Sequence, residues 1–119
     1  MALHSQLPLY KTVYELTRSV FIFKRNMPRD FNKSMGERIE GELISISVLV
    51  FRANVARNKI PYLNELLERK EVADYLLRLA VDLQAISPKQ FGAMIRLLDS
   101  IGKQANGWRK QSLAASPAT

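Results

Sequence analysis

The segment Ser87–Lys110, with the sequence SPKQFGAMIRLLDSIGKQANGWRK, decides the fold because it contains a helix start followed by a complete two-faced helix. Ser87, Pro88 and Gln90 predict the helix N-terminus. The serine hydroxyl can cap a backbone N–H, proline has no N–H to leave unpaired, and glutamine can close a capping box. The apolar residues that follow alternate three- and four-residue steps, which predicts one buried stripe: Phe91, Met94, Ile95, Leu98, Ile101, Ala105 and Trp108.

The same segment carries a second, positively charged stripe. We call it the C-terminal cationic row: Lys89, Arg96, Lys103 and Lys110, at seven-residue intervals. Seven residues fall just short of two helical turns, so these side chains share one face, roughly opposite the apolar stripe. On a single helix, a row of cations such as this one is most simply interpreted as a solvent-exposed surface. However, a second row has the same spacing, and the two rows together favour a basic surface. This N-terminal cationic row is Lys11, Arg18 and Arg25.

Composition limits the class of protein. A chain of 119 residues with 47% hydrophobic content predicts one domain with one core, here residues 8–110, between a flexible N-terminus at 1–7 and a disordered tail at 111–119. The absence of cysteine fits a reducing compartment. The charge of +7 favours a polyanionic partner. No secretory signal is visible, and the most apolar run, 43–51, is too short to span a bilayer, so we expect a cytoplasmic location.

Three more helices are predicted before Ser87. The first begins at Pro8, with a seam at strict four-three spacing: Leu9, Val13, Leu16, Val20 and Phe23. Residues 26–33 are expected to form a connection, after which Ser34 and Glu37 predict a capping box. The second helix is expected over 34–58, although 44–48 alternates like a strand, because apolar residues keep helical phase throughout. The third is expected from Pro61 to about Leu83. Short links then predict an antiparallel, up-down-up-down four-helix bundle.

Two apolar surfaces exceed what one bundle core needs. Tyr10, Tyr14 and Phe21 form an aromatic strip between the first seam and the N-terminal cationic row. Such rings can stack nucleobases, but tyrosine is enriched at protein interfaces, so we favour burial against a neighbouring subunit. The third helix is apolar over more than half of its circumference, which implies contact between protomers. We expect its second face to make that contact: Val72, Tyr75 and Leu79.

The sequence offers no catalytic or metal-binding constellation. His4 is the single histidine and lies in the predicted flexible end. Metal sites in helical bundles use Glu-x-x-His motifs, whereas Glu37-x-x-Glu40 and Glu65-x-x-Glu68 have no imidazole beside them. No glycine-rich phosphate loop is present. We therefore expect no enzyme, no metal, no cofactor and no small-molecule substrate.

Several short motifs resemble one known family in both order and spacing. The family is that of the accessory variability determinant proteins of diversity-generating retroelements, which are related to four-helix-bundle proteins encoded in 23S rRNA intervening sequences. The similar segments are Leu9-Tyr10-Lys11, Met35-Gly36-Glu37-Arg38-Ile39-Glu40, Leu77-Arg78-Leu79-Ala80 with Asp82, Ile86-Ser87-Pro88-Lys89-Gln90, Leu97-Leu98-Asp99, Ile101-Gly102-Lys103 and Gly107-Trp108. This chain departs from the family at Gln104-Ala105-Asn106, where relatives are more hydrophobic.

The resemblance implies a specific function. Family members are four-helix bundles that form homopentamers with a basic surface, bind the reverse transcriptase and template RNA, and support mutagenic cDNA synthesis. The resemblance also implies that the two cationic rows face the RNA, so the nucleic-acid-binding candidates include Lys11, Arg18, Arg25, Lys89, Arg96, Lys103 and Lys110. Arg78 and Lys103 match positions that are usually basic in the family, which makes them the best candidates that the resemblance provides. A rival hypothesis from the intervening-sequence relatives is a scaffold that acts only in protein–protein contact, with its charge serving solubility. A membrane-surface role is not expected, because no exposed apolar face flanked by lysines remains once the core forms.

Overall fold

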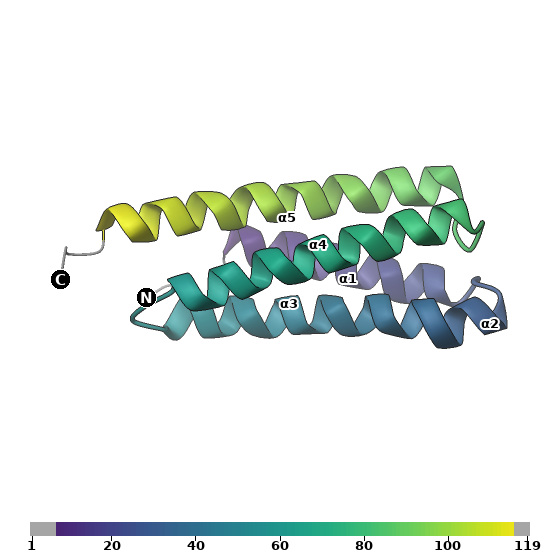
Figure 1. Ribbon diagram of the computed structural model, residues 1–119, viewed down its shortest axis with the longest axis horizontal. Helices are drawn as coiled ribbons and strands as arrows, with labels where there is room; N and C mark the ends of the chain where they lie inside the picture. The colour runs from purple at the N-terminus through teal and green to yellow at the C-terminus, as the bar shows by residue number, and fades with distance from the viewer. Residues whose placement is uncertain (1–6, 116–119) are drawn as a thin grey trace.

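The computed structural model describes residues 7–115 and shows an all-α fold with no strand in that range. The elements are α1 (Pro8–Lys24), α2 (Arg29–Phe31), a π-helical turn (Asn32–Gly36), α3 (Glu37–Val55), α4 (Ile60–Asp82) and α5 (Pro88–Ala115). The four long helices lie side by side along one axis (Figure 1), in a body of 51 × 23 × 21 Å. The predicted four-helix bundle is confirmed.

The helices are arranged around the core in a ring. α1 packs against α3 and α5, and α4 packs against the same two helices. α1 and α4 therefore occupy opposite corners of the bundle. Successive long helices run in opposite directions, as predicted (Figure 1).

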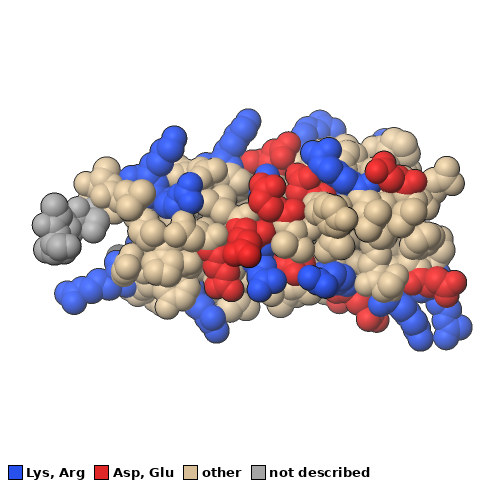
Figure 2. All heavy atoms as spheres, in the orientation of Figure 1, with Lys and Arg blue, Asp and Glu red and all other residues tan. Residues whose placement is uncertain are grey.

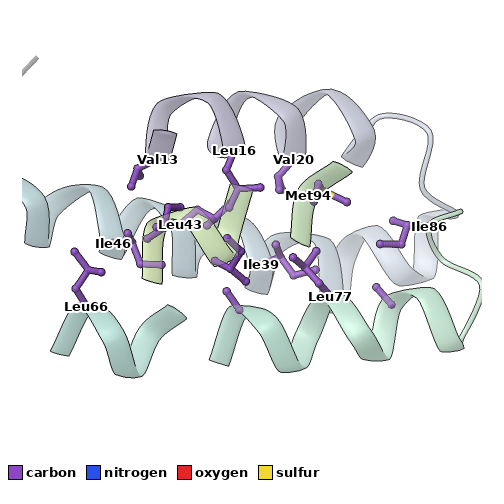
Figure 3. Close-up of a cluster of buried hydrophobic side chains, with 14 of the residues drawn as sticks. Val13, Leu16, Val20, Ile39, Leu43, Ile46, Leu66, Leu77, Ile86 and Met94 are labelled. Atoms are coloured by element: carbon purple, nitrogen blue, oxygen red, sulfur yellow. The ribbon is translucent and has the colours of Figure 1, made fainter. Parts of the chain in front are cut away.

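Each long helix contributes one stripe to a common core. The predicted seam of α1 is buried at Val13, Leu16 and Val20, which point toward side chains of α3 in Figure 3. From α5, the residues that face the core form the inner part of the predicted stripe: Met94, Leu98, Ile101 and Ala105. Burying a leucine or isoleucine side chain contributes about 1.5–3 kcal/mol, so the buried stripes of the four helices together supply most of the driving force for folding.

The turn from α4 into α5 is fixed by two local motifs. The predicted capping box is present, because Ser87 N donates to Gln90 Oε1 (2.9 Å) and Gln90 N donates to Ser87 Oγ (3.1 Å). Just before it, Ala85 N donates to Ala80 O (2.8 Å) and Gln84 N donates to the carbonyl of Val81 (3.0 Å). This is a Schellman ending, and it places Gln84 at φ 62° in the left-handed region.

The predicted capping box at Ser34 is wrong. Ser34 Oγ donates to the carbonyl of Asp30 (2.9 Å), so the serine lies within a helical turn and not at a helix start. The chain is already helical from Arg29, directly after Pro28, so the connection after α1 is shorter than the predicted residues 26–33. Asn32 Nδ2 donates to Lys24 O (2.9 Å) and ties this turn to the end of α1.

α3 ends at Val55, before the predicted end at Asn58. Lys59 explains this boundary. Its Nζ donates to the carbonyls of Ala53 (2.9 Å) and Ala56 (3.0 Å), as well as that of Asn54 (3.2 Å). A cation at a helix C-terminus satisfies carbonyls that have no partner within the helix and interacts favourably with the helix dipole. The β-branched stretch at 44–48 is helical, as predicted.

The ends of the chain differ from expectation. α5 continues beyond residue 110 to Ala115, so the first part of the predicted tail is helical. Leu113, Ala114 and Ala115 are good helix formers, which accounts for the extension. Leu7, assigned to the flexible N-terminus, is the N-cap residue of α1 and packs against the core. The rest of both predicted segments, including His4, lies outside the described residues.

Gln84→Gly should stabilise the protein. A side chain in the left-handed region costs roughly 1–2 kcal/mol, and glycine avoids this cost but gains entropy in the unfolded chain, so we expect a net gain of about 1 kcal/mol. Urea unfolding followed by circular dichroism measures the change. Gln111→Gly, in the exposed body of α5, is the control and should destabilise. A loss of stability in Gln84→Gly would contradict the assigned turn.

Candidate nucleic-acid and subunit interfaces

The C-terminal cationic row lies exposed along α5. All four side chains are accessible, and none forms an ion pair within residues 7–115. Asp99, one turn before Lys103, could have neutralised it, but no bridge forms between them. Arg96 Nε donates only to the carbonyl of Gly92 (3.3 Å). The row therefore presents uncompensated positive charge to solvent.

The N-terminal cationic row is also exposed and makes no ion pair within the described part of the chain. Each row lies opposite the buried stripe of its own helix and so points away from the bundle axis. Because α1 and α5 occupy neighbouring corners, the rows form two separate ridges and not one flat surface. Between the rows, Gln104 Nε2 donates to Thr12 Oγ1 (2.9 Å) and to Ser100 Oγ (3.0 Å), so uncharged hydrogen-bonded side chains separate the two ridges.

Arg78 has a different environment from the rows. Its guanidinium pairs with Asp74 and lies 5.7 Å from the ring centroid of Phe91. The hydrogen bond and charge of Asp74, helped by Asp99 and Asp82, raise the pKa of Arg78 further above its ordinary value. The residue stays charged at any relevant pH, but acids already balance that charge. Arg78 is thus a weaker candidate than Lys103, although the family resemblance implies both.

The charge of the molecule is unevenly distributed among the helices. α5 has one acid, Asp99, against five cations: Lys89, Arg96, Lys103, Arg109 and Lys110. On α4 the acids outnumber the cations: Glu65, Glu68, Glu71, Asp74 and Asp82 against Arg69, Lys70 and Arg78. Figure 2 shows acidic side chains gathered across the middle of the face that α4 presents. The net positive charge therefore comes from other parts of the surface.

Tyr10 of the α1 aromatic strip stacks on Tyr14 of the same helix and makes a tilted ring contact with Phe51 of α3. Tyr10 is half-buried, and its ring centroid lies 6.2 Å from that of Tyr14 and 6.1 Å from that of Phe51. Tyr14 remains 59% exposed and Phe21 is exposed at 44%. Both rings are thus available to a further partner.

The second face of α4 is less free than its sequence indicates. Tyr75 is 68% exposed, but Val72 is half-buried and Leu79 packs against the core of its own subunit. Ile86, which continues this face, is fully part of the core. The apolar surplus of α4 is therefore used partly within one protomer, and Tyr75 is its main exposed ring.

An exposed apolar stripe on α3 was not predicted from the sequence. Ile44, Val48, Phe51 and Val55 are exposed at four-three-four spacing along this helix. The middle of α3 is apolar nearly all round, and this helix has more buried residues than any other in the described part of the chain, but these four side chains remain exposed. Their spacing was the available signal. Because Phe51 contacts Tyr10 of α1, the stripe joins the aromatic strip in one surface, which we call the α1/α3 face.

A family model described as bAvd-like matches residues 7–112, which covers all four long helices except the last three residues of α5. The chain belongs to the bAvd-like family. The resemblance to accessory variability determinant proteins is confirmed, and the protein is an accessory protein of the diversity-generating retroelement type, from a non-catalytic family. Among curated proteins, no match to the chain is found.

The described part of the bAvd-like protein has neither a metal-binding cluster nor a helix that could span a membrane. Within residues 7–115, no three His, Cys, Asp or Glu side chains are grouped so that they could hold a metal ion. In the same range, every helix is too short or too polar to cross a membrane.

Asp74→Asn should strengthen binding to polyanions. The substitution removes one negative charge and releases the guanidinium of Arg78 for other partners. We expect the Asp74→Asn variant to elute from heparin at a higher salt concentration than the unmodified protein. In the unmodified protein, the single substitution Arg78→Gln should lower the elution concentration less than Lys103→Gln does. Equal losses for Arg78→Gln and Lys103→Gln would show that Asp74 does not neutralise Arg78.

Proposed function

We propose that this bAvd-like protein is a cytoplasmic, non-enzymatic, oligomeric accessory protein that binds the reverse transcriptase and the template RNA of its retroelement. In this role it supports mutagenic cDNA synthesis. The observation that carries the proposal is the C-terminal cationic row, four exposed side chains on one helix face with no ion pair within the described residues.

The row has a geometry suited to a nucleic-acid backbone. From Lys89 to Lys110 it extends about 32 Å at 1.5 Å per helical residue, which is longer than a single ligand site requires. Lysine and arginine side chains bind phosphates with little dependence on sequence. Since α5 is flanked by helices and not by base-reading loops, recognition would depend on RNA shape and on the protein partner.

Oligomerisation would multiply this binding surface. Several copies of one weak row, held in a fixed arrangement, bind a long polyanion more tightly than one row does. The exposed α1/α3 face and Tyr75 supply apolar surface for such contacts. The number five comes from the family resemblance, and no cofactor or small-molecule substrate is part of the proposal.

The rival function is an intervening-sequence-type scaffold that acts only through protein–protein contact. The same exposed apolar stripe of α3 favours it, because contiguous apolar surface marks interaction sites whatever the partner. The two functions differ in what the positive charge does. In a scaffold it serves solubility alone, so its position on α5 would not matter.

Arg96→Glu combined with Lys103→Glu should abolish binding to structured template RNA while leaving the oligomer intact. The unmodified protein should bind RNA tightly at low salt and lose at least a hundredfold of its affinity as salt rises to physiological levels and above, because phosphate binding releases counterions. Band-shift titrations at several salt concentrations measure this.

A matched control separates the row from the overall charge. Arg29→Glu with Lys33→Glu removes the same net charge at exposed positions near the end of the bundle. This variant should keep most of its RNA affinity. Equal losses in both variants, or salt-independent binding by the unmodified protein, would favour the scaffold function.

The reverse transcriptase of the same retroelement should co-purify with the protein. We expect a tagged copy to retain the enzyme after ribonuclease treatment, because an accessory protein needs a direct contact and not only a shared RNA. As the control, a tagged four-helix-bundle protein without a basic row should not retain the enzyme. Loss of the enzyme after ribonuclease treatment would restrict the proposal to RNA binding.

A further inference from the structure

We propose that the α1/α3 face of one subunit docks head to tail on the α4 face of a second copy, with the N-terminal cationic row against the acids of α4. The inference rests on the oligomeric part of the proposed function and assigns the faces that make the contact. It also gives the N-terminal row a role different from RNA binding.

The first face combines cations with apolar rings. Lys11 and Arg18 on α1 and Arg25 at its C-cap alternate with Tyr14 and Phe21, both of which are well exposed. Beside them lies the exposed stripe of α3. None of the three cations is paired within residues 7–115. A partner for this face should therefore present carboxylates that flank an apolar ring.

The α4 face has the complementary pattern. Glu68, Tyr75 and Asp82 follow one another at seven-residue intervals, so they form one row along the outside of the helix. Tyr75 is the most exposed large hydrophobic residue in the described part of the chain, and all three side chains are exposed. Glu68 and Asp82 make no ion pair in residues 7–115. An aromatic ring thus lies midway between two free carboxylates.

The two rows also match in length. Lys11 and Arg25 are separated by the same number of residues as Glu68 and Asp82, and each pair spans about 21 Å along its helix. The ends of one row can therefore meet the ends of the other whether the two helices dock parallel or antiparallel. In both directions Tyr75 faces the middle of the α1 row, where Tyr14 and Phe21 lie beside Arg18, so these rings lie between the charged ends and are shielded from water.

The positions of the two faces determine the kind of assembly. α1 and α4 occupy opposite corners of the bundle, so one subunit can use both faces at once with two different neighbours. Such a heterologous contact repeats around a closed ring or along an open filament, whereas two copies of one face would stop at a dimer. The C-terminal cationic row is on α5 and stays free of the contact.

Reversal of the two row ends on α1 tests the contact. Lys11→Glu with Arg25→Glu places like charges opposite each other and should shift the assembly toward the 13.6 kDa single chain in light scattering coupled to size exclusion. Arg96→Glu with Lys103→Glu, a matched reversal on α5, should leave the mass unchanged. An oligomer of unchanged mass in the α1 variant would overturn the inference.

A compensating variant excludes simple misfolding. Adding Glu68→Lys and Asp82→Lys to the α1 variant exchanges the charges of the two faces and should restore the original mass. Failure to recover it, with helicity intact by circular dichroism, would overturn the inference. An unmodified protein that is a monomer would overturn both this contact and the oligomeric part of the proposed function. An oligomer whose mass does not respond to these substitutions would overturn the contact alone. RNA binding is measured separately by band shift.

Discussion

Burial of one apolar stripe from each of four long helices is the constraint on which the rest of the structure depends. Nucleating a helix is costly, and in proteins most of the stability of a helix comes from packing of its apolar face and not from its own propensity. Residues such as Leu16, Ile46 and Leu98 are fully buried only when all four helices are present. The ring order around this core then fixes which direction every other side chain faces.

The residues that each helix buries in the core determine which of its residues face solvent. A seven-residue interval keeps a row on one side of a helix, and a row opposite the buried stripe must point into solvent. The two cationic rows therefore become two ridges on neighbouring corners, while the acids of α4 lie on another side. This segregation of charge gives the bAvd-like protein distinct surfaces for a polyanion and for a second subunit in the functions proposed above.

Local sequence signals predicted the fold where they acted alone and failed where tertiary contacts competed. Ser87 and Gln90 lie after a tight turn, and their capping box forms as expected. Ser34 and Glu37 have the same spacing, but the chain before them is already helical and anchored by Asn32 to Lys24, so the serine has no free helix end to cap. The end of α3 likewise depends on Lys59, whose amine reaches back across the turn.

The sequence by itself determined the number of long helices, their buried stripes, the family and the two cationic rows, because periodicity specifies which residues share a face of one helix. Only the tertiary structure decided what each face meets. It neutralised Arg78 with nearby acids, left the α3 stripe uncovered, and buried Glu42 between α3 and α4, where its Oε1 accepts from Arg38 and Arg69 at 3.4 and 3.3 Å. Neighbouring helices set these environments, and a pattern within one helix carries no information about the angle or side from which another helix approaches.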